Sequence, residues 1–216
     1  MTSALDLIVF DWDGTLMDSE AKIVRCVQAA AADTGIADPG PAAIRRIIGL
    51  GLSEAIATLF PEESPAQRLD LIDRYRVHFL ERDDTAMPLF PGVIEGLTGL
   101  AERGYLLAVA TGKSRRGLDR VLDETGTRGL FVATRCADEA FSKPHPQMLD
   151  DILGATGMPR ARTLMVGDTV YDMQMALNAR VAGLGVSYGV HARDELLASG
   201  ALACVDSFEA VCTWVA

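Results

Sequence analysis

Short apolar runs that end at a polar residue recur along the sequence, and they constrain the fold more than any other feature. The first run, 8–10, stops at Asp11, and further runs follow at 105–110, 130–134, 163–166, 181–186 and 201–205. Segments with the apolar spacing of a helix, such as 93–100, separate several of these runs. Strands that alternate with helices predict an α/β fold, in which a Rossmann-like parallel sheet is covered on both faces. In such sheets the functional site lies beyond the carboxyl ends of the strands.

Residues 17–85 interrupt this alternation. Their apolar residues recur at helical spacing, as at Ile23, Val24 and Val27, and prolines separate the successive stretches. No run in this segment has the pattern of a strand. We therefore predict an all-helical subdomain over 17–85, inserted directly after the first strand, and an α/β core formed by residues 1–16 and 86–216.

The composition of the 216 residues excludes several functional classes. Hydrophobic residues make up 49%, which is enough for a sizeable core, and 20 Lys and Arg against 30 Asp and Glu give a net charge of −10. An acidic chain lacks the positive surface that nucleic acids and anionic membranes attract. No apolar stretch reaches the length of a membrane span, and the N-terminus has no signal-like pattern. The sequence thus predicts a cytoplasmic protein without nucleic-acid or membrane partners.

The first motif with chemical potential is Asp11-Trp12-Asp13-Gly14, at the end of the first predicted strand. In an extended segment, positions two apart point the same way, so both carboxylates can face one pocket. Gly14 permits a close backbone approach that other residues do not. An ordinary turn after a strand also uses Asp and Gly, so the motif alone leaves a purely structural explanation open.

Two further segments offer groups that bind anions. Thr111 and Gly112 follow the 105–110 run and supply a hydroxyl and free backbone N–H groups ahead of a helix. Lys143 precedes Pro144, which restricts the backbone before it. Taken singly, a helix cap explains the first segment and a solvated surface lysine explains the second.

Asp168 and Asp172 follow the 163–166 run. If a helix begins near Asp168, the two carboxylates lie on one face of it. Carboxylate oxygens suit Mg²⁺, which takes one or two carboxylates together with waters and substrate phosphate. A helix cap at Asp168 explains that residue but not a second Asp facing the same pocket. The four segments together form a set of groups suited to a divalent metal ion and a phosphate.

With these motifs in this order, the sequence resembles the haloacid dehalogenase (HAD) superfamily, over nearly the whole chain. Residues 11–16 resemble its first motif, DxDGT, and Thr111, Lys143 and the 167–172 segment resemble its second, third and fourth. The helical insertion resembles the C1 cap of that superfamily, and the sequence is most similar to phosphoglycolate phosphatase-like members.

The resemblance implies a role for each motif residue. Asp11 is expected to be the nucleophile that forms an aspartyl-phosphate, and Asp13 the acid and then the base. Thr111 and Lys143 are expected to hold the phosphoryl oxygens, with Gly14 and Gly112 close to the substrate. The expected Mg²⁺ ligands and their supporting carboxylate are Asp11, the backbone carbonyl of Asp13, Asp168 and Asp172.

The expected function is Mg²⁺-dependent hydrolysis of a small phosphorylated metabolite such as 2-phosphoglycolate, by a monomer or homodimer. A dehalogenase is disfavoured, because the resemblance implies that dehalogenases lack the second acid of the first motif. A sugar phosphomutase stays possible, although residues 48–53 of the cap carry no basic side chain such as the related mutases place there. A phosphate-binding module without turnover is a third possibility. Arg45 is a candidate for binding a substrate carboxylate, and a solvated helix face is its simpler explanation.

Overall fold

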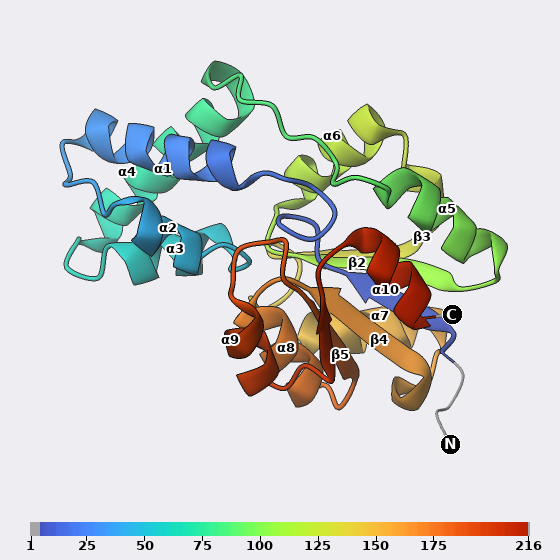
Figure 1. The fold of residues 1–216 in the computed structure, drawn as a ribbon. Helices are drawn as coiled ribbons and strands as arrows, with labels where there is room; N and C mark the ends of the chain where they lie inside the picture. Colours follow the sequence, from blue (N-terminus) through green and yellow to red (C-terminus); the bar gives the residue numbers. More distant parts are fainter. Residues whose placement is uncertain (1–4, 216) are drawn as a thin grey trace.

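The computed structural model describes residues 5–215, and its centre is a parallel sheet of six strands in the order β3-β2-β1-β4-β5-β6 (Figure 1). β1 pairs with β2 on one side and with β4 on the other. β1 is therefore a central strand, and Asp11, the residue after it, lies at the carboxyl edge of the middle of the sheet. The strands are β1 Leu7–Phe10, β2 Leu106–Thr111, β3 Phe131–Cys136, β4 Thr163–Gly167, β5 Ala182–Val186 and β6 Ala203–Val205.

Both faces of the sheet are buried, which explains why β1 is apolar at every position. Ile8 and Phe10 belong to one hydrophobic cluster, and Leu7 and Val9 belong to the cluster on the opposite face. Helices α5, α6 and α10 pack on the first face, and α7 and α8 pack on the second (Figure 1). The predicted α/β fold with helices on both sides of a parallel sheet is confirmed.

Two of the core helices are followed directly by a glycine. Gly126 and Gly157 both follow a helix with a positive φ, 68° and 70°, a conformation that glycine adopts without strain. The core helices are α5 Val93–Glu102, α6 Arg115–Thr125, α7 Gln147–Thr156, α8 Val170–Asn178, α9 Arg193–Ala198 and α10 Phe208–Val215, with short 3₁₀ turns η2 Arg128–Leu130 and η3 Arg160–Arg162.

A helical insertion lies between β1 and β2, as the sequence predicts. Its elements are α1 Glu20–Thr34, α2 Pro41–Arg46, α3 Leu52–Leu59, α4 Pro65–Val77 and the π-helical turn η1 His78–Arg82. Ile44, Ile56 and Leu71 are buried in a hydrophobic cluster of its own. We call this insertion the cap; the limits 17 and 85 stay a prediction.

The two chain segments that join the cap to the core run beside each other. The backbone N–H of Asp18 donates to the carbonyl of Pro88 at 2.8 Å, and that of Phe90 donates to Leu16 at 3.0 Å. Met17 also forms an antiparallel bridge with Leu89. The cap therefore leaves and rejoins the core at one place, next to the end of β1.

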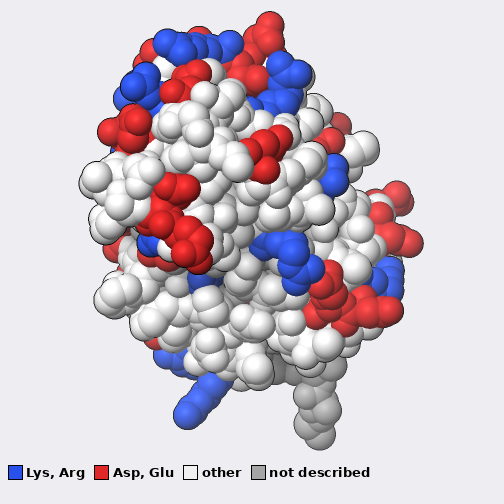
Figure 2. Space-filling view, turned by 90° about the vertical axis from the view of Figure 1, so that its left-hand side faces the viewer, with Lys and Arg blue, Asp and Glu red and all other residues white. Residues whose placement is uncertain are grey.

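Within the described part of the chain, no helix is both long enough and apolar enough to cross a membrane. Acidic and basic side chains are interspersed over the face of the molecule in Figure 2. The absence of a nucleic-acid partner stays a prediction that rests on the net charge.

The packing of α5 on the sheet predicts the effect of a cavity. Leu100 is fully buried in the cluster on the first face, so Leu100→Ala is expected to lower the free energy of unfolding by about 2–5 kcal/mol. The same change at Leu177, which is 63% exposed, is expected to cost less than about 0.5 kcal/mol. Urea unfolding followed by circular dichroism measures both. Equal losses would show that the burial of Leu100 contributes little.

Candidate active site

Three buried carboxylates meet at the carboxyl edge of the sheet. Asp11 follows β1, Asp168 follows β4, and Asp172 lies in the first turn of α8. Each offers a carboxylate oxygen that lies within 4.8 Å of the others. The structure thus brings the first and fourth sequence motifs to one place, because β1 and β4 are neighbours in the sheet.

Lys143 brings the third motif to the same place. Its Nζ lies 2.9 Å from Asp11 Oδ1 and 2.6 Å from Asp172 Oδ1, and all three side chains are almost entirely buried. Burial opposes a charged lysine, but the two carboxylates outweigh it and hold the pKa of Lys143 above its ordinary value. A solvated surface lysine, the simpler explanation of this residue, is therefore wrong.

From the sequence we considered a helix that begins near Asp168, with Asp168 and Asp172 on one face. Helix α8 instead begins at Val170, two residues later. Thr169 is its cap: the Thr169 Oγ1 accepts a hydrogen bond from the backbone N–H of Asp172, whose carboxylate in turn accepts one from the N–H of Thr169. Asp168 lies before the helix and is not its cap. Asp168 and Asp172 still meet, because the turn rather than a common helix face brings them together.

Asp168 is fixed by donors from two other segments. Thr15 Oγ1 donates to its Oδ1 at 2.8 Å, and the backbone N–H of Val190 donates to its Oδ2 at 2.9 Å. Gly14 has a φ of 81°, and a Cβ there would overlap the Asp168 carboxylate. The glycine of the first motif is thus required by the close approach of its backbone to the fourth motif.

The charges of this cluster do not balance without a further cation. Burial, and then the charge of Asp172, raise the pKa of Asp11 to about 7, against the opposing effect of Lys143. Burial and the charges of Asp11 and Asp172 also raise the pKa of Asp168 well above its ordinary value. Asp11 Oδ2 is buried and accepts no hydrogen bond from the residues that the structure describes. Three carboxylates, one ammonium group and an oxygen without a partner fit a hard divalent cation.

The residues of the second motif differ in their surroundings: Gly112 lines a cavity together with Asp11, and Thr111 is not among the described lining residues. Thr111 is the last residue of β2, fully buried, and its Oγ1 accepts a hydrogen bond from the backbone N–H of Lys113 at 3.2 Å. Gly112 lines a cavity, and a Cβ there would overlap the backbone carbonyl of Leu50 in the cap. Gly112 is therefore needed where cap and core touch.

This cavity, of about 270 Å³, lies between the cap and the carboxyl edge of the sheet. Asp11 and Asp13 line it from the core, and Phe79 is among the residues that line it from the cap. Lys143 and Asp168 are not among the described lining residues, although Lys143 contacts Asp11 at 2.9 Å. Asp11 is thus the member of the carboxylate cluster that also faces a space a small molecule can enter.

Asp13 has two partners that the sequence did not lead us to expect. Ser19 Oγ donates to Asp13 Oδ1 at 2.5 Å, and Lys113 Nζ lies 2.8 Å from the same oxygen. A lysine two residues after Thr111 is the sequence signal that could have drawn attention to Lys113. Ser19 follows the first motif without a pattern of its own.

Arg45 is placed away from this cavity. It lies on α2, half exposed, with its Nε 2.5 Å from Glu20 Oε1, and it is not among the lining residues. Its neighbour Arg46 pairs with Glu195 of the core at 3.2 Å. The role of Arg45 as a substrate ligand stays a prediction, and Glu20 is the partner that the structure gives it.

Comparison with known families agrees with this geometry. The family model described as "Haloacid dehalogenase-like hydrolase" matches residues 8–186, which span β1 to the end of β5. The chain belongs to this family. The match includes the cap as well as the strand ends that bear the cluster.

Among the relatives of this haloacid dehalogenase-like hydrolase is "Probable phosphatase IndB" of Dickeya dadantii, 36% identical over 209 residues, which cover 95% of this chain and 91% of the relative. A phosphoglycolate phosphatase of Agrobacterium fabrum is 31% identical over 188 residues, 85% of this chain and 81% of the relative. The crystal structure of "a predicted phosphoglycolate phosphatase" from Haemophilus somnus superimposes with a TM-score of 0.90 at 24% identity, over 100% of both chains, which bears on the fold.

The carboxylate cluster predicts that Mg²⁺ stabilises the fold. A ligand that binds only the native state adds about 2.7 kcal/mol to the free energy of unfolding at a hundred times its dissociation constant. Mg²⁺ is therefore expected to raise the melting temperature of the wild type, and Asp168→Asn to remove most of that rise. Asp206→Asn, at an exposed position, is the matched control and keeps it. Scanning fluorimetry with and without Mg²⁺ measures the shift, and equal shifts in all three proteins would contradict the site.

The raised pKa of Asp11 predicts a pH dependence in EDTA. Its pKa is about 7 in the folded chain against 3.8 for an ordinary Asp, so between these values the native state holds a proton that the unfolded chain has lost. The free energy of unfolding therefore falls as the pH rises from about 4 to about 7. Asp11→Asn lacks this contribution, so the wild type is expected to lose stability relative to the variant over that range. Urea unfolding at several pH values tests this, and a constant difference would contradict it.

Proposed function

We propose that this hydrolase is a Mg²⁺-dependent phosphatase that cleaves a small phosphomonoester through an aspartyl-phosphate intermediate. The observation on which this rests is the placement of Asp11: its Oδ2 has no hydrogen-bond partner among residues 5–215, its Oδ1 is paired with Lys143, and the residue lines a cavity. The names of the relatives from Dickeya and Agrobacterium, both phosphatases, support the same reaction class.

In the first step, a carboxylate oxygen of Asp11 forms a bond to the phosphorus atom, and the bond from phosphorus to the ester oxygen breaks. Asp13 gives a proton to that oxygen, which leaves as an alcohol. Asp13 suits this role because it lines the same cavity two residues after Asp11. The products of the step are the alcohol and phosphorylated Asp11.

In the second step, Asp13 takes a proton from a water molecule as the water oxygen bonds to phosphorus. The bond between phosphorus and Asp11 breaks, so inorganic phosphate leaves and the Asp11 carboxylate is restored. Asp13 ends the step protonated, ready to serve as the acid again. The two steps thus return the enzyme to its starting state.

Asp11 must be ionised to attack, although burial raises its pKa. Lys143 favours the ionised form, and Mg²⁺ would be held by Asp11, Asp168 and the backbone carbonyl of Asp13, with Asp172 supporting Lys143. Bound there, the ion supplies positive charge that offsets the negative charge of the phosphoryl group. The transition state spreads its charge over three oxygens, so positioned cations and donors are the main catalytic requirement.

Lys143 and the hydroxyl of Thr111 are assigned to the phosphoryl oxygens, to which they would donate. That Gly14 and Gly112 lie close to the substrate stays a prediction, since the space beside Gly14 is filled by Asp168 and that beside Gly112 by Leu50. A cavity of about 270 Å³ favours a small metabolite over a polymer. The Agrobacterium relative is named a phosphoglycolate phosphatase, which makes 2-phosphoglycolate the first substrate to test.

The nucleophile is tested with a generic ester. The wild type is expected to hydrolyse p-nitrophenyl phosphate only with Mg²⁺, and Asp11→Asn to reduce kcat by about 10³-fold or more, since it removes the group that forms a bond in the transition state. Asp18→Asn, the same change at an exposed position nearby, is expected to keep full activity. Phosphate release in a continuous assay measures all three. Full activity of Asp11→Asn would remove Asp11 as nucleophile.

A further inference from the structure

A second buried lysine, Lys113, lines the cavity, whereas Lys143 is not among the described lining residues. Lys113 lines the cavity with only 6% of its side chain exposed, and its Nζ is 2.8 Å from Asp13 Oδ1. The same ammonium group lies 5.0 Å from the centre of the Phe79 ring in the cap. A buried ammonium group needs such partners, because leaving it unpaired away from water is costly. Lys113 thus stands where core, cap and cavity meet.

The backbone around Lys113 is held from two sides. Ala137 donates its N–H to the carbonyl of Lys113 at 3.0 Å, and the next residue, Ser114, caps α6 through the N–H of Gly117. The N–H of Arg115 donates to both carboxylate oxygens of Asp138, at 2.9 and 3.1 Å. The position of the lysine backbone is therefore determined by hydrogen bonds rather than by its side chain.

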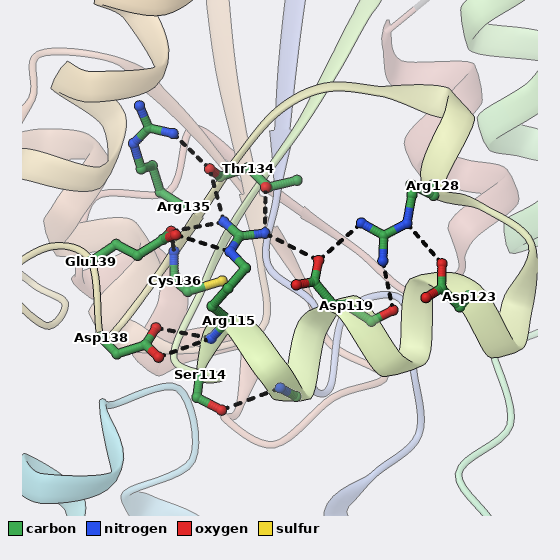
Figure 3. A network of polar contacts seen from close by, with 11 residues as sticks. Ser114, Arg115, Asp119, Asp123, Arg128, Thr134, Arg135, Cys136, Asp138 and Glu139 are labelled. Carbon is green, nitrogen blue, oxygen red and sulfur yellow. Dashed lines mark hydrogen bonds and ion pairs between the residues drawn. The ribbon is translucent and has the colours of Figure 1, made fainter.

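Figure 3 shows that the side chain of Arg115 strengthens this attachment. Its guanidinium group pairs with Glu139 through two nitrogens, at 2.9 and 2.7 Å, and donates to Thr134 Oγ1 at 2.9 Å. Asp119 connects this group to Arg128 of η2, which lies along the same face of α6 (Figure 3). The start of α6, and with it Lys113, is thus tied to β3 and the loop after it.

Lys113 is the buried cation that the described cavity lining offers to a bound molecule. Arg76 also lines the cavity, but its side chain is 57% exposed and paired with Asp73 on its own helix. Asp13 has a second partner in Ser19, so it keeps a hydrogen bond if Lys113 turns to another anion. An anionic group on a substrate can therefore replace Asp13 as the partner of Lys113, while Asp13 keeps its hydrogen bond from Ser19.

We propose that Lys113 determines specificity by binding a carboxylate on the substrate, close to the phosphoryl group that is transferred. This rests on the proposed phosphatase function. Lys113 contacts Asp13, which is two residues from the nucleophile Asp11, so the two anionic groups of the substrate must be close together. The structure thus favours a short phosphomonoester with a carboxylate one or two carbons from the ester oxygen. Phe79 completes the site by holding the ammonium group from the cap.

Two phosphate esters of the same chain length distinguish carboxylate binding by Lys113 from a structural contribution that affects every substrate. 2-Phosphoglycolate has a carboxylate where ethyl phosphate has a methyl group, so the ratio of their kcat/KM values reports the contribution of the carboxylate. Lys113→Met is expected to lower this ratio by about tenfold or more, because a charge-assisted hydrogen bond is lost. Lys113→Arg, which keeps the charge, is expected to restore part of it. A merely structural role of Lys113 would lower both values and leave the ratio unchanged.

Lys22 provides the matched control. It is also a buried lysine whose Nζ lies near the Phe79 ring, at 5.3 Å, but it donates to the backbone carbonyl of Asp83 and is not among the lining residues. Lys22→Met is therefore expected to keep the wild-type ratio within about twofold, since a packing change outside the cavity lining affects both esters alike. A drop as large as that of Lys113→Met would overturn the assignment to Lys113.

Binding measurements keep the two proposals distinguishable. Calorimetry with Asp11→Asn, with and without Lys113→Met, compares the affinities for 2-phosphoglycolate and ethyl phosphate in the absence of turnover. If Asp11→Asn binds 2-phosphoglycolate more tightly than ethyl phosphate and Lys113→Met abolishes this preference, the role of Lys113 is supported. If the wild type hydrolyses none of the esters, the proposed phosphatase function is contradicted, whatever the binding preference. If the enzyme hydrolyses p-nitrophenyl phosphate but shows no preference between 2-phosphoglycolate and ethyl phosphate, in rate or in binding, the role of Lys113 is contradicted. The proposed phosphatase function is then unaffected.

Discussion

The ion pairs of Lys143 with Asp11 and Asp172 are the interaction on which the rest of the site depends. All three side chains are buried, so each charge is stable only while its partners are present. The lysine comes from the loop before α7, and its partners come from the end of β1 and the first turn of α8. One ammonium group therefore links three segments that are far apart in the sequence, at the edge of the sheet where their strands end.

The negative charge that Lys143 leaves uncompensated gives this edge its chemistry. Asp168 adds a third buried carboxylate, and Asp11 Oδ2 has no partner within the described chain. A hard cation and a phosphoryl group supply complementary charges to this arrangement, since the cation offsets the carboxylates and screens the anionic substrate from them. Within the cavity, Lys113 offers a second ammonium group next to Asp13. We propose that the two lysines bind different parts of the substrate: Lys143 binds the phosphoryl group, and Lys113 binds the carboxylate.

The sequence predicted the sheet and the strand ends well because both depend on local pattern. Apolar runs such as 8–10 and 163–166 are buried on both faces, and a run of that kind has few alternatives to a strand in a covered parallel sheet. It also follows from the sheet that Asp11 and Asp168 meet. The predicted start of α8 was wrong, because local pattern cannot decide between Asp168 and Thr169 as the helix cap. The Asp168 carboxylate accepts hydrogen bonds from Thr15 and Val190 instead, and these contacts depend on the tertiary fold.

The contacts between cap and core could not be predicted from local pattern. Lys113 meets Phe79, and Gly112 meets Leu50, only because the cap folds back over the sheet edge, and no periodicity in either segment encodes that approach. Arg45 was chosen for its charge alone, and the structure pairs it with Glu20. Charged side chains on a helix satisfy many partners equally well, so their targets emerge only with the tertiary fold.

The central claim is that Asp11 becomes phosphorylated during turnover. Its most direct test is to quench the wild-type enzyme with acid during steady hydrolysis of saturating p-nitrophenyl phosphate and to map the digested peptides by mass spectrometry. Our account predicts a phosphoryl group on the peptide from β1, attached to Asp11. A phosphoryl group on another side chain, or an unmodified Asp11 peptide throughout steady turnover, would contradict it.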